Sequence, residues 1–125
     1  MNNRIRIAVP TSGAGGLDAQ RSAHFGHADS FTLVDVADGQ IVGDEALVNP
    51  PHTHGGCGMT VSMLADAGAG SAIVVGMGGG PMSAMNRCGM KAFFDDQSAT
   101  PRLAVEAFLA GGLREFGSDQ LCSGH

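Results

Sequence analysis

The first half of the chain carries short runs of apolar residues that predict β-strands. Arg4–Val9 alternates charged and apolar side chains before it turns fully apolar, and Ser30–Val36 and Ile41–Leu47 are rich in β-branched and other apolar residues. Asp38-Gly39 stands between the last two runs, and an Asp-Gly pair is a strong signal for a two-residue hairpin turn. We therefore expect three strands here, with the second and third as antiparallel neighbours.

The second half of the chain alternates helices with short buried strands. Apolar residues recur at helical spacing in three segments: Met59, Met63, Leu64 and Ala67; Met82, Met85 and Cys88; and Leu103, Ala104, Ala107 and Phe108. Strands are predicted at Ala72–Val75 and Lys91–Phe94. Pro81 and Pro101 suit the first positions of the last two helices, and Gly68 and Gly89 suit the ends of the first two.

This order of elements predicts one α/β domain over residues 1–116, followed by a mobile C-terminal tail at 117–125. Its sheet would be mixed and five-stranded, with helices packed against it and one strand antiparallel to the rest. The carboxyl ends of the other four strands would then share one edge, where ligands of open α/β sheets bind. The loops leaving that edge are 11–29, 48–58, 76–80 and 95–100, and they contain His24, His27, His52, His54 and Cys57.

Composition and charge exclude several classes of partner. The chain has 125 residues, a formal net charge of -5, scattered Lys and Arg, and neither Trp nor Tyr. A basic nucleic-acid groove, a base-stacking platform and an anionic membrane surface are therefore not expected. The N-terminus lacks the features of a signal peptide, no apolar run is long enough to span a bilayer, and three cysteines are too few for a disulfide framework. We expect a cytoplasmic protein.

The stretch Pro50–Gly58, PPHTHGGCG, concentrates possible metal ligands. His52, His54 and Cys57 form an H-x-H-x-x-C pattern, and Cys57 directly precedes a predicted helix. The helix dipole and the free N–H groups of the first turn favour a thiolate there, and thiolates suit soft metals and iron–sulfur clusters. A closed zinc site needs a fourth ligand that this spacing does not supply. Spacing alone leaves a metal or cluster site and a polar loop equally open.

The remaining histidines and cysteines differ in whether the sequence places them at this edge of the sheet. His24 and His27 flank Phe25-Gly26, and a strand-entry loop in which Phe25 fills the core explains the Phe and Gly but not the two histidines. Cys88 lies late in its helix, where the dipole disfavours a thiolate, and is expected as a buried core thiol. Cys122 and His125, in the predicted tail, stay open as possible contributors.

The glycine run GMGGGP follows a predicted strand and opens a predicted helix. No Lys-Ser/Thr follows it, which excludes a Walker loop. Gly76-x-Gly78 and Asp95 allow a dinucleotide-binding interpretation, although Pro81 takes the place of the third glycine. Backbone N–H groups of Gly78, Gly79 and Gly80 presented to an anion are the simpler expectation.

Three stretches of the chain resemble the dinitrogenase iron–molybdenum cofactor-binding family, which includes NifX-type carriers, the C-terminal domain of NifB and the molybdenum–copper orange protein. They are SAHFGHADSFTLVDVADGQI, NPPHTHGGCGMTVSMLADAGAGSAIVVGMGGGPMSAMNRCGMKAFF and the terminal helix. The resemblance implies a ribonuclease-H-like three-layer α/β/α fold and non-catalytic binding of a metal–sulfur cluster or its precursor. His24 matches the motif histidine of the family, and His27 stands where relatives often have a basic residue.

The sequence therefore predicts a carrier or storage protein for an iron–sulfur, iron–molybdenum or molybdenum–copper cluster, similar to nitrogenase accessory proteins. The metal contacts expected are His24, His52, His54 and Cys57, with His27, Gly78, Gly79 and Gly80 as further cluster-binding residues. The expected partners are cluster-assembly or acceptor proteins, with no nucleic acid and no membrane. The alternatives are a mononuclear Zn- or Cu-binding or sensing module, and a nucleotide-binding regulatory domain.

Overall fold

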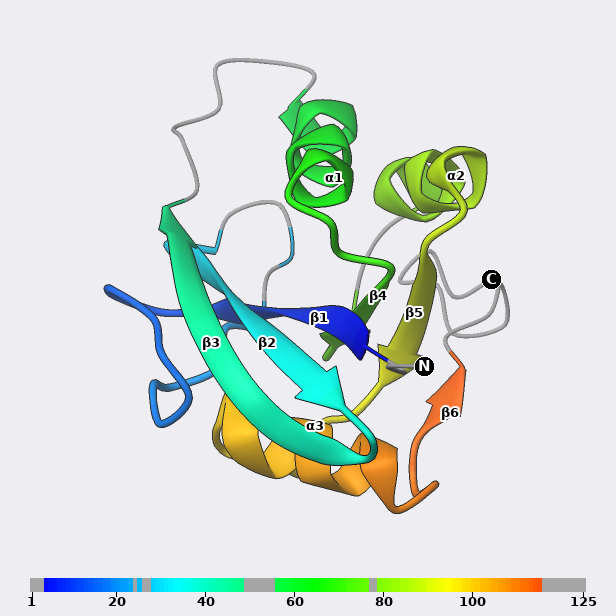
Figure 1. The fold of residues 1–125 in the computed structure, drawn as a ribbon. Helices are drawn as coiled ribbons and strands as arrows, with labels where there is room; N and C mark the ends of the chain where they lie inside the picture. Colours follow the sequence, from blue (N-terminus) through cyan, green and yellow to red (C-terminus); the bar gives the residue numbers. More distant parts are fainter. Residues whose placement is uncertain (1–3, 24, 26–27, 49–55, 77–78, 116–125) are drawn as a thin grey trace.

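The computed structural model describes residues 4–23, 25, 28–48, 56–76 and 79–115, which form a mixed sheet between two layers of helices (Figure 1). The strands are β1 (Arg4–Thr11), β2 (Ser30–Ala37), β3 (Gln40–Val48), β4 (Ser71–Val74), β5 (Lys91–Phe94) and β6 (Arg114–Glu115). The helices are α1 (Gly56–Asp66), α2 (Gly79–Cys88) and α3 (Pro101–Leu109). No described helix is long and apolar enough to cross a membrane.

The sheet has the strand order β3-β2-β1-β4-β5-β6. β2 is antiparallel to both β1 and β3, and β1, β4 and β5 are mutually parallel. Consequently β1, β3, β4 and β5 all point the same way, as the sequence predicted. We call the edge of the sheet at their carboxyl ends the carboxyl edge.

The β2–β3 connection is the hairpin that the Asp-Gly pair predicts. Asp38 has φ 53° and Gly39 has φ 80°, so both central residues adopt the left-handed conformation that a type I′ turn requires. Ala37 and Gln40 close the turn as paired residues. This turn fixes the register in which β3 lies along β2.

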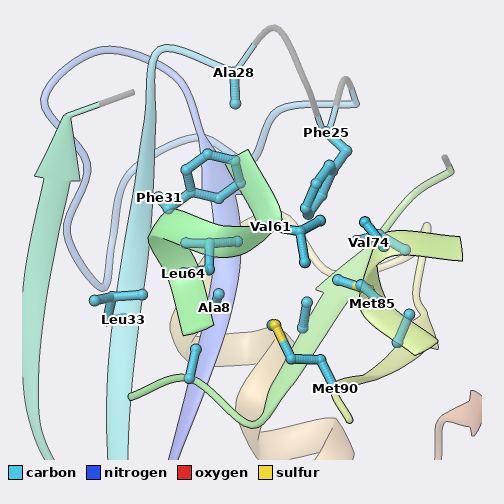
Figure 2. Close-up of a cluster of buried hydrophobic side chains, with 14 residues drawn as sticks. Ala8, Phe25, Ala28, Phe31, Leu33, Val61, Leu64, Val74, Met85 and Met90 are labelled. Atoms are coloured by element: carbon cyan, nitrogen blue, oxygen red, sulfur yellow. The ribbon is translucent and has the colours of Figure 1, made fainter. Parts of the chain in front are cut away.

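The two faces of the sheet bury separate apolar cores. The face under α1 and α2 contains the larger cluster, which Figure 2 shows with Phe31, Leu33, Leu64, Met85 and Met90 among its members. The opposite face packs on α3 and contains Ile7, Val9, Val34, Val36, Ile73, Ala104 and Val105. Helices therefore cover both faces, with α1 and α2 on one side and α3 on the other (Figure 1).

The structure corrects the predicted strand number from five to six. The additional strand, β6, pairs antiparallel with the end of β5 through Arg114 and Glu115. Both residues are exposed and charged, and two residues cannot show an alternating pattern, so the sequence carries no signal for this strand. The described sheet thus has two strands, β2 and β6, that run against the others.

Two predicted core positions are also wrong. Cys88 is exposed, as are the two residues before it in the last turn of α2, and Met90, after the turn at Gly89, packs in the cluster with Met85 instead. On α3, Leu103 is 48% exposed, whereas Val105 is fully buried beside Ala104. The inner face of α3 is therefore rotated by a residue from the one predicted.

Two helix starts differ slightly from the prediction, and the third agrees with it. α1 begins at Gly56, so Cys57 is its second residue rather than the residue before it, and α2 begins at Gly79, which makes Pro81 its third residue. Pro101 does open α3, where the Thr100 hydroxyl accepts a hydrogen bond from the Leu103 N–H at 3.3 Å. Each difference moves a boundary and leaves the element in place.

Candidate functional site

The carboxyl edge gathers the loops that carry most of the predicted site residues. The segments between β1 and β2, β3 and α1, β4 and α2, and β5 and α3 all leave from it. β1 and β4 are neighbours whose connections lead to opposite sides of the sheet, so the point where the topology reverses lies between them. Open α/β sheets bind their ligands at such a point.

Most of the predicted ligands lie outside the described residues. They are His24, His27, His52, His54 and Gly78, and the possible contributors Cys122 and His125 also fall there. The backbones of Cys57, Gly79 and Gly80 lie in the first turns of α1 and α2. The first-turn position of Cys57 is the one that favours a thiolate, since the N–H groups there have no partner within the helix. Among the described residues, no group of three or more His, Cys, Asp or Glu side chains is placed to hold a metal ion.

Phe25 anchors the loop that contains the two predicted histidines, as its sequence predicted. It is 3% exposed and packs edge-to-face on Phe31, with the ring centroids 5.4 Å apart. Figure 2 shows Phe25 beside Val61 of α1 and Val74 of β4, in one buried cluster. His24 directly precedes Phe25 in the sequence, so the loop between β1 and β2 is anchored in this cluster one residue away from a predicted ligand.

The first part of the β1–β2 loop is held by buried hydroxyl groups. The Thr11 hydroxyl lies 2.7 Å from the Ser30 hydroxyl and 3.2 Å from that of Thr32, and the Gly16 N–H donates to Thr32 Oγ1 at 2.9 Å. A Cβ on Gly15, whose φ is +83°, would lie 2.9 Å from Ser30 Oγ. A glycine is therefore required at this position for both its conformation and its space.

The same loop is tied to the segment that leads into α3. The Arg102 N–H donates to the Leu17 carbonyl at 3.0 Å, and the Arg102 guanidinium contacts both carboxylate oxygens of Asp18 at 3.0 Å. The backbone N–H of Arg21 donates to the Ala99 carbonyl at 3.4 Å. These bonds fix the path of the chain immediately before His24.

A buried ion pair joins these two segments at the carboxyl edge. Arg21 Nη1 lies 3.4 Å from Asp95 Oδ2, and the two side chains are only 4% and 3% exposed. Arg21 Nη1 also donates to the Ser98 carbonyl at 3.1 Å, while Asp95 Oδ1 accepts the backbone N–H groups of Gln97 at 2.9 Å and Ser98 at 3.2 Å. Two opposite charges are thus removed from water at the rim of the candidate site.

The environment shifts the pKa of both partners downward. Burial lowers the pKa of the Arg21 guanidinium, against the opposing effect of the Asp95 and Asp96 charges. Burial acts to raise the pKa of Asp95, but hydrogen bonds from Ser98 and Gln97 and the charge of Arg21 outweigh it, so the net shift is downward. The Asp95 carboxylate is therefore held in its charged form.

Arg21 has no part in the prediction from sequence, and Asp95 enters it only through the dinucleotide-binding interpretation. In the structure the Asp95 carboxylate is engaged by Arg21 and by two backbone N–H groups. The available signal was an acidic residue directly after an apolar strand, together with an arginine in an otherwise small-residue loop, AQRSAHFGH. Neither pattern identifies the partner, because the two residues are 74 positions apart in sequence (95 − 21).

The fold and the edge together define a class of protein: a three-layer α/β chain whose candidate site lies where the strand order reverses. The chain belongs to the dinitrogenase iron-molybdenum cofactor family, whose model matches residues 3–111. No curated protein sequence matches the chain significantly.

Solved structures agree with this membership. The apo form of the orange protein from Desulfovibrio gigas is 30% identical, with a TM-score of 0.77 over 90% of this chain and 92% of that one. A NifB-like protein from Thermotoga is 25% identical, with a TM-score of 0.72 over 89% of this chain and 92% of that one. A dinitrogenase-like protein from Methanocaldococcus jannaschii, at 10% identity, has a TM-score of 0.72 over 91% of this chain and 96% of that one, and shares the fold.

Proposed function

We propose that this protein binds, carries or stores a metal–sulfur cluster or its precursor at the carboxyl edge, without catalysing a reaction. The observation that carries the proposal is the family match over residues 3–111, in a chain whose histidine- and cysteine-bearing loops leave one edge of the sheet. The orange protein and the NifB-like protein are the relatives that point to metal–sulfur chemistry. The cluster would be of the iron–sulfur, iron–molybdenum or molybdenum–copper type.

The ligands that we propose are His24, His52, His54 and Cys57. Cys57 has the strongest support, because its place in the first turn of α1 favours the thiolate that such clusters require. His27 would lie beside the cluster. Gly78, Gly79 and Gly80 would supply N–H donors to its sulfur atoms, and α2 does begin at Gly79.

The surroundings that we propose follow from the same membership. The partners would be proteins that assemble or accept the cluster, and neither nucleic acid nor a membrane would be a partner. The three-layer fold would be of the ribonuclease-H-like type, with residues 1–116 as the cluster-binding domain, 117–125 as a tail, and a cytoplasmic location.

Anaerobic reconstitution tests the proposal, with the two helix cysteines as matched variants. The protein is incubated with iron and sulfide, with and without tetrathiomolybdate, and separately with Cu(I) and tetrathiomolybdate; bound metal and sulfide are then measured after desalting. We expect a coloured product in wild type, a clear loss in Cys57→Ser and His24→Asn, and no loss in Cys88→Ser, since Cys88 is exposed at the far end of α2.

Two results would contradict this function, and a third would change its proposed site. A colourless, metal-free protein under every condition would refute cluster binding. One bound Zn or Cu ion per chain, held without sulfide and lost in Cys57→Ser, would instead establish the mononuclear metal site. Equal loss of colour in Cys57→Ser and Cys88→Ser would show that the thiols act non-specifically and would remove Cys57 from the site.

A further inference from the structure

Arg21 lies where the strand order reverses. Its backbone pairs with Thr11 at the carboxyl end of β1, and its guanidinium reaches Asp95, the first residue after β5. β4 lies between β1 and β5 in the sheet, and the backbone N–H of Asp95 donates to the carbonyl of Val74, the last residue of β4, at 3.0 Å, so Arg21 is paired with a residue at the carboxyl end of β4. The glycine segment that leads to α2 leaves from that same end.

The guanidinium of Arg21 has more donors than the described residues satisfy. Arginine carries five N–H groups. Nη1 donates to the Ser98 carbonyl, whereas Nε and Nη2 are buried and have no hydrogen-bond partner among the residues that the structure describes. Buried donors are nearly always satisfied in folded proteins, so unpartnered ones require an explanation such as a ligand.

Asp95 compensates the charge of Arg21 only in part. The carboxylate oxygen nearest to the guanidinium, Oδ2, lies 3.4 Å from Nη1 and makes no hydrogen bond within the described part of the chain. The other oxygen, Oδ1, is occupied by the N–H groups of Gln97 and Ser98. A salt bridge built only for stability would be expected to use the two-pronged geometry that arginine offers to a carboxylate.

The free pair of donors matches the chemistry of a tetrahedral dianion. Nε–H and Nη2–H point in parallel from one side of a guanidinium and can donate to two acceptor atoms of one anion. Oxo and sulfido groups around a central metal or main-group atom provide such acceptors. A buried setting strengthens each of these bonds, because little water competes for them.

We propose that Arg21 is an anion-recognising residue of the carboxyl-edge site, and that its Nε and Nη2 donate to oxo or sulfido groups of an anionic cargo. This inference rests on the proposed function and adds a residue that recognises the negative charge of the bound metal–sulfur ligand. Nη1 stays on the Ser98 carbonyl, so the side chain is held in place before the ligand arrives. The ligand class is a tetrahedral oxo- or thio-metallate, free or as part of a larger cluster.

The test measures binding of molybdate and of tetrathiomolybdate, each alone, to the full chain by equilibrium dialysis and metal analysis under anaerobic conditions. We expect Arg21→Gln to weaken binding by about tenfold or more, since hydrogen bonds to charged groups are lost. Arg21→Lys keeps the positive charge but lacks the paired N–H donors of the guanidinium, so it should lose part of the affinity for the anion. Arg87→Gln, an exposed arginine in the last turn of α2, is the matched control and should bind like wild type.

Asp95→Asn separates ligand recognition from a purely structural role. Asparagine keeps an oxygen for the N–H groups of Gln97 and Ser98 and removes the charge that competes for Arg21, so this variant should bind the anions as tightly as wild type or several-fold more tightly. Added anion should also raise its Tm more than that of wild type. A structural pair would instead make Asp95→Asn and Arg21→Gln lose binding together, in step with their loss of stability.

The outcomes distinguish this inference from the proposed function. Wild type that forms a metal–sulfur cluster, with equal anion affinity in wild type and Arg21→Gln, would overturn the role of Arg21 and leave the proposed function standing. Preferential binding of tetrathiomolybdate over molybdate would assign the site to thio-anions. Wild type that binds neither anion and forms no cluster would refute both proposals.

Discussion

The buried pair of Arg21 and Asp95 sets up a stability experiment whose size can be worked out from the structure. The changes are Arg21→Met, Asp95→Asn, Asp95→Ala and the double variant Arg21→Met/Asp95→Asn. Both native side chains are almost fully buried, at 4% and 3% exposure. Each single change therefore leaves the other group as a buried charge or a set of buried donors without its partner.

Removing one partner of a buried ion pair costs about 3–5 kcal/mol of unfolding free energy. The 3.4 Å separation and the missing direct hydrogen bond place this pair at the lower end, so Asp95→Asn should cost about 3 kcal/mol. Asp95→Ala also removes the acceptor of two backbone N–H groups and should cost about 1–2 kcal/mol more. Arg21→Met leaves the Asp95 carboxylate as a buried charge without its partner, although Oδ1 keeps its backbone bonds, and should also cost about 3 kcal/mol.

The double variant tests whether the two charges interact. Because no uncompensated charge remains in Arg21→Met/Asp95→Asn, its cost should be smaller than the sum of the singles by about 2 kcal/mol. Urea unfolding followed by circular dichroism at pH 7 measures each free energy by linear extrapolation. Asp96→Asn, an exposed neighbour, is the control and should stay within about 0.5 kcal/mol of wild type.

A coupling energy close to zero, or an Asp95→Asn variant as stable as wild type, would refute a stabilising ion pair between Arg21 and Asp95. Additive costs would mean that each side chain acts through its own backbone bonds and that the opposite charges do not stabilise each other. An unchanged Asp95→Asn would mean that burial of the carboxylate already offsets whatever the ion pair contributes. Either result would also remove the electrostatic basis for tying the β1–β2 loop to the start of α3.

Three further predictions concern the sheet and its loops. Gly15→Ala should destabilise the protein by about 2–4 kcal/mol, because residue 15 has a positive φ and the added Cβ would clash with buried hydroxyl groups. Gly13→Ala should cost only about 1 kcal/mol, because residue 13 also has a positive φ but its added Cβ would meet no neighbouring atom. Equal losses of Tm in the two variants would contradict this. The Arg6 guanidinium beside Asp35 holds the pKa of that carboxyl below its ordinary value, so wild type should lose stability as the pH falls below about 4. Asp35→Asn should be less stable than wild type at pH 7, and its Tm should depend less on pH in the acid range. A dependence of Tm on acid pH that is the same in both proteins would contradict this. Leu64→Ala, at a fully buried position within α1, should cost about 2–5 kcal/mol in urea unfolding, and a cost below about 1 kcal/mol would show that the neighbouring side chains can collapse into the cavity.

The sign of the acid effect follows from linkage. A carboxyl whose pKa is lower in the folded than in the unfolded protein stabilises the fold at any pH above its unfolded pKa. That contribution is lost as the pH falls through the folded pKa, where both states become protonated. Asp95 shifts in the same direction as Asp35, so the two carboxyls add in the same pH range.

The strands and helices were largely predictable because their signals are local. The Asp-Gly turn, the apolar runs and the helix-ending glycines each depend on residues that are close in sequence, and the structure places β2, β3 and all three helices within a few residues of the prediction. The shared carboxyl edge followed as well, since one antiparallel strand among parallel ones leaves few possible topologies. The family resemblance from the sequence is confirmed by the match over residues 3–111.

Only the tertiary structure decided which side chains meet. Arg21 and Asp95 gave no sequence signal for each other, and their pairing depends on β5 lying two strands from β1 and on a loop that folds back beside β1. Cys88 has the same spacing as a core residue, yet it is exposed in the last turn of α2, and no pattern within the helix reports this. Local propensity and periodicity determine elements and edges, whereas burial, charge pairing and unpartnered donors arise when segments distant in sequence exclude water together.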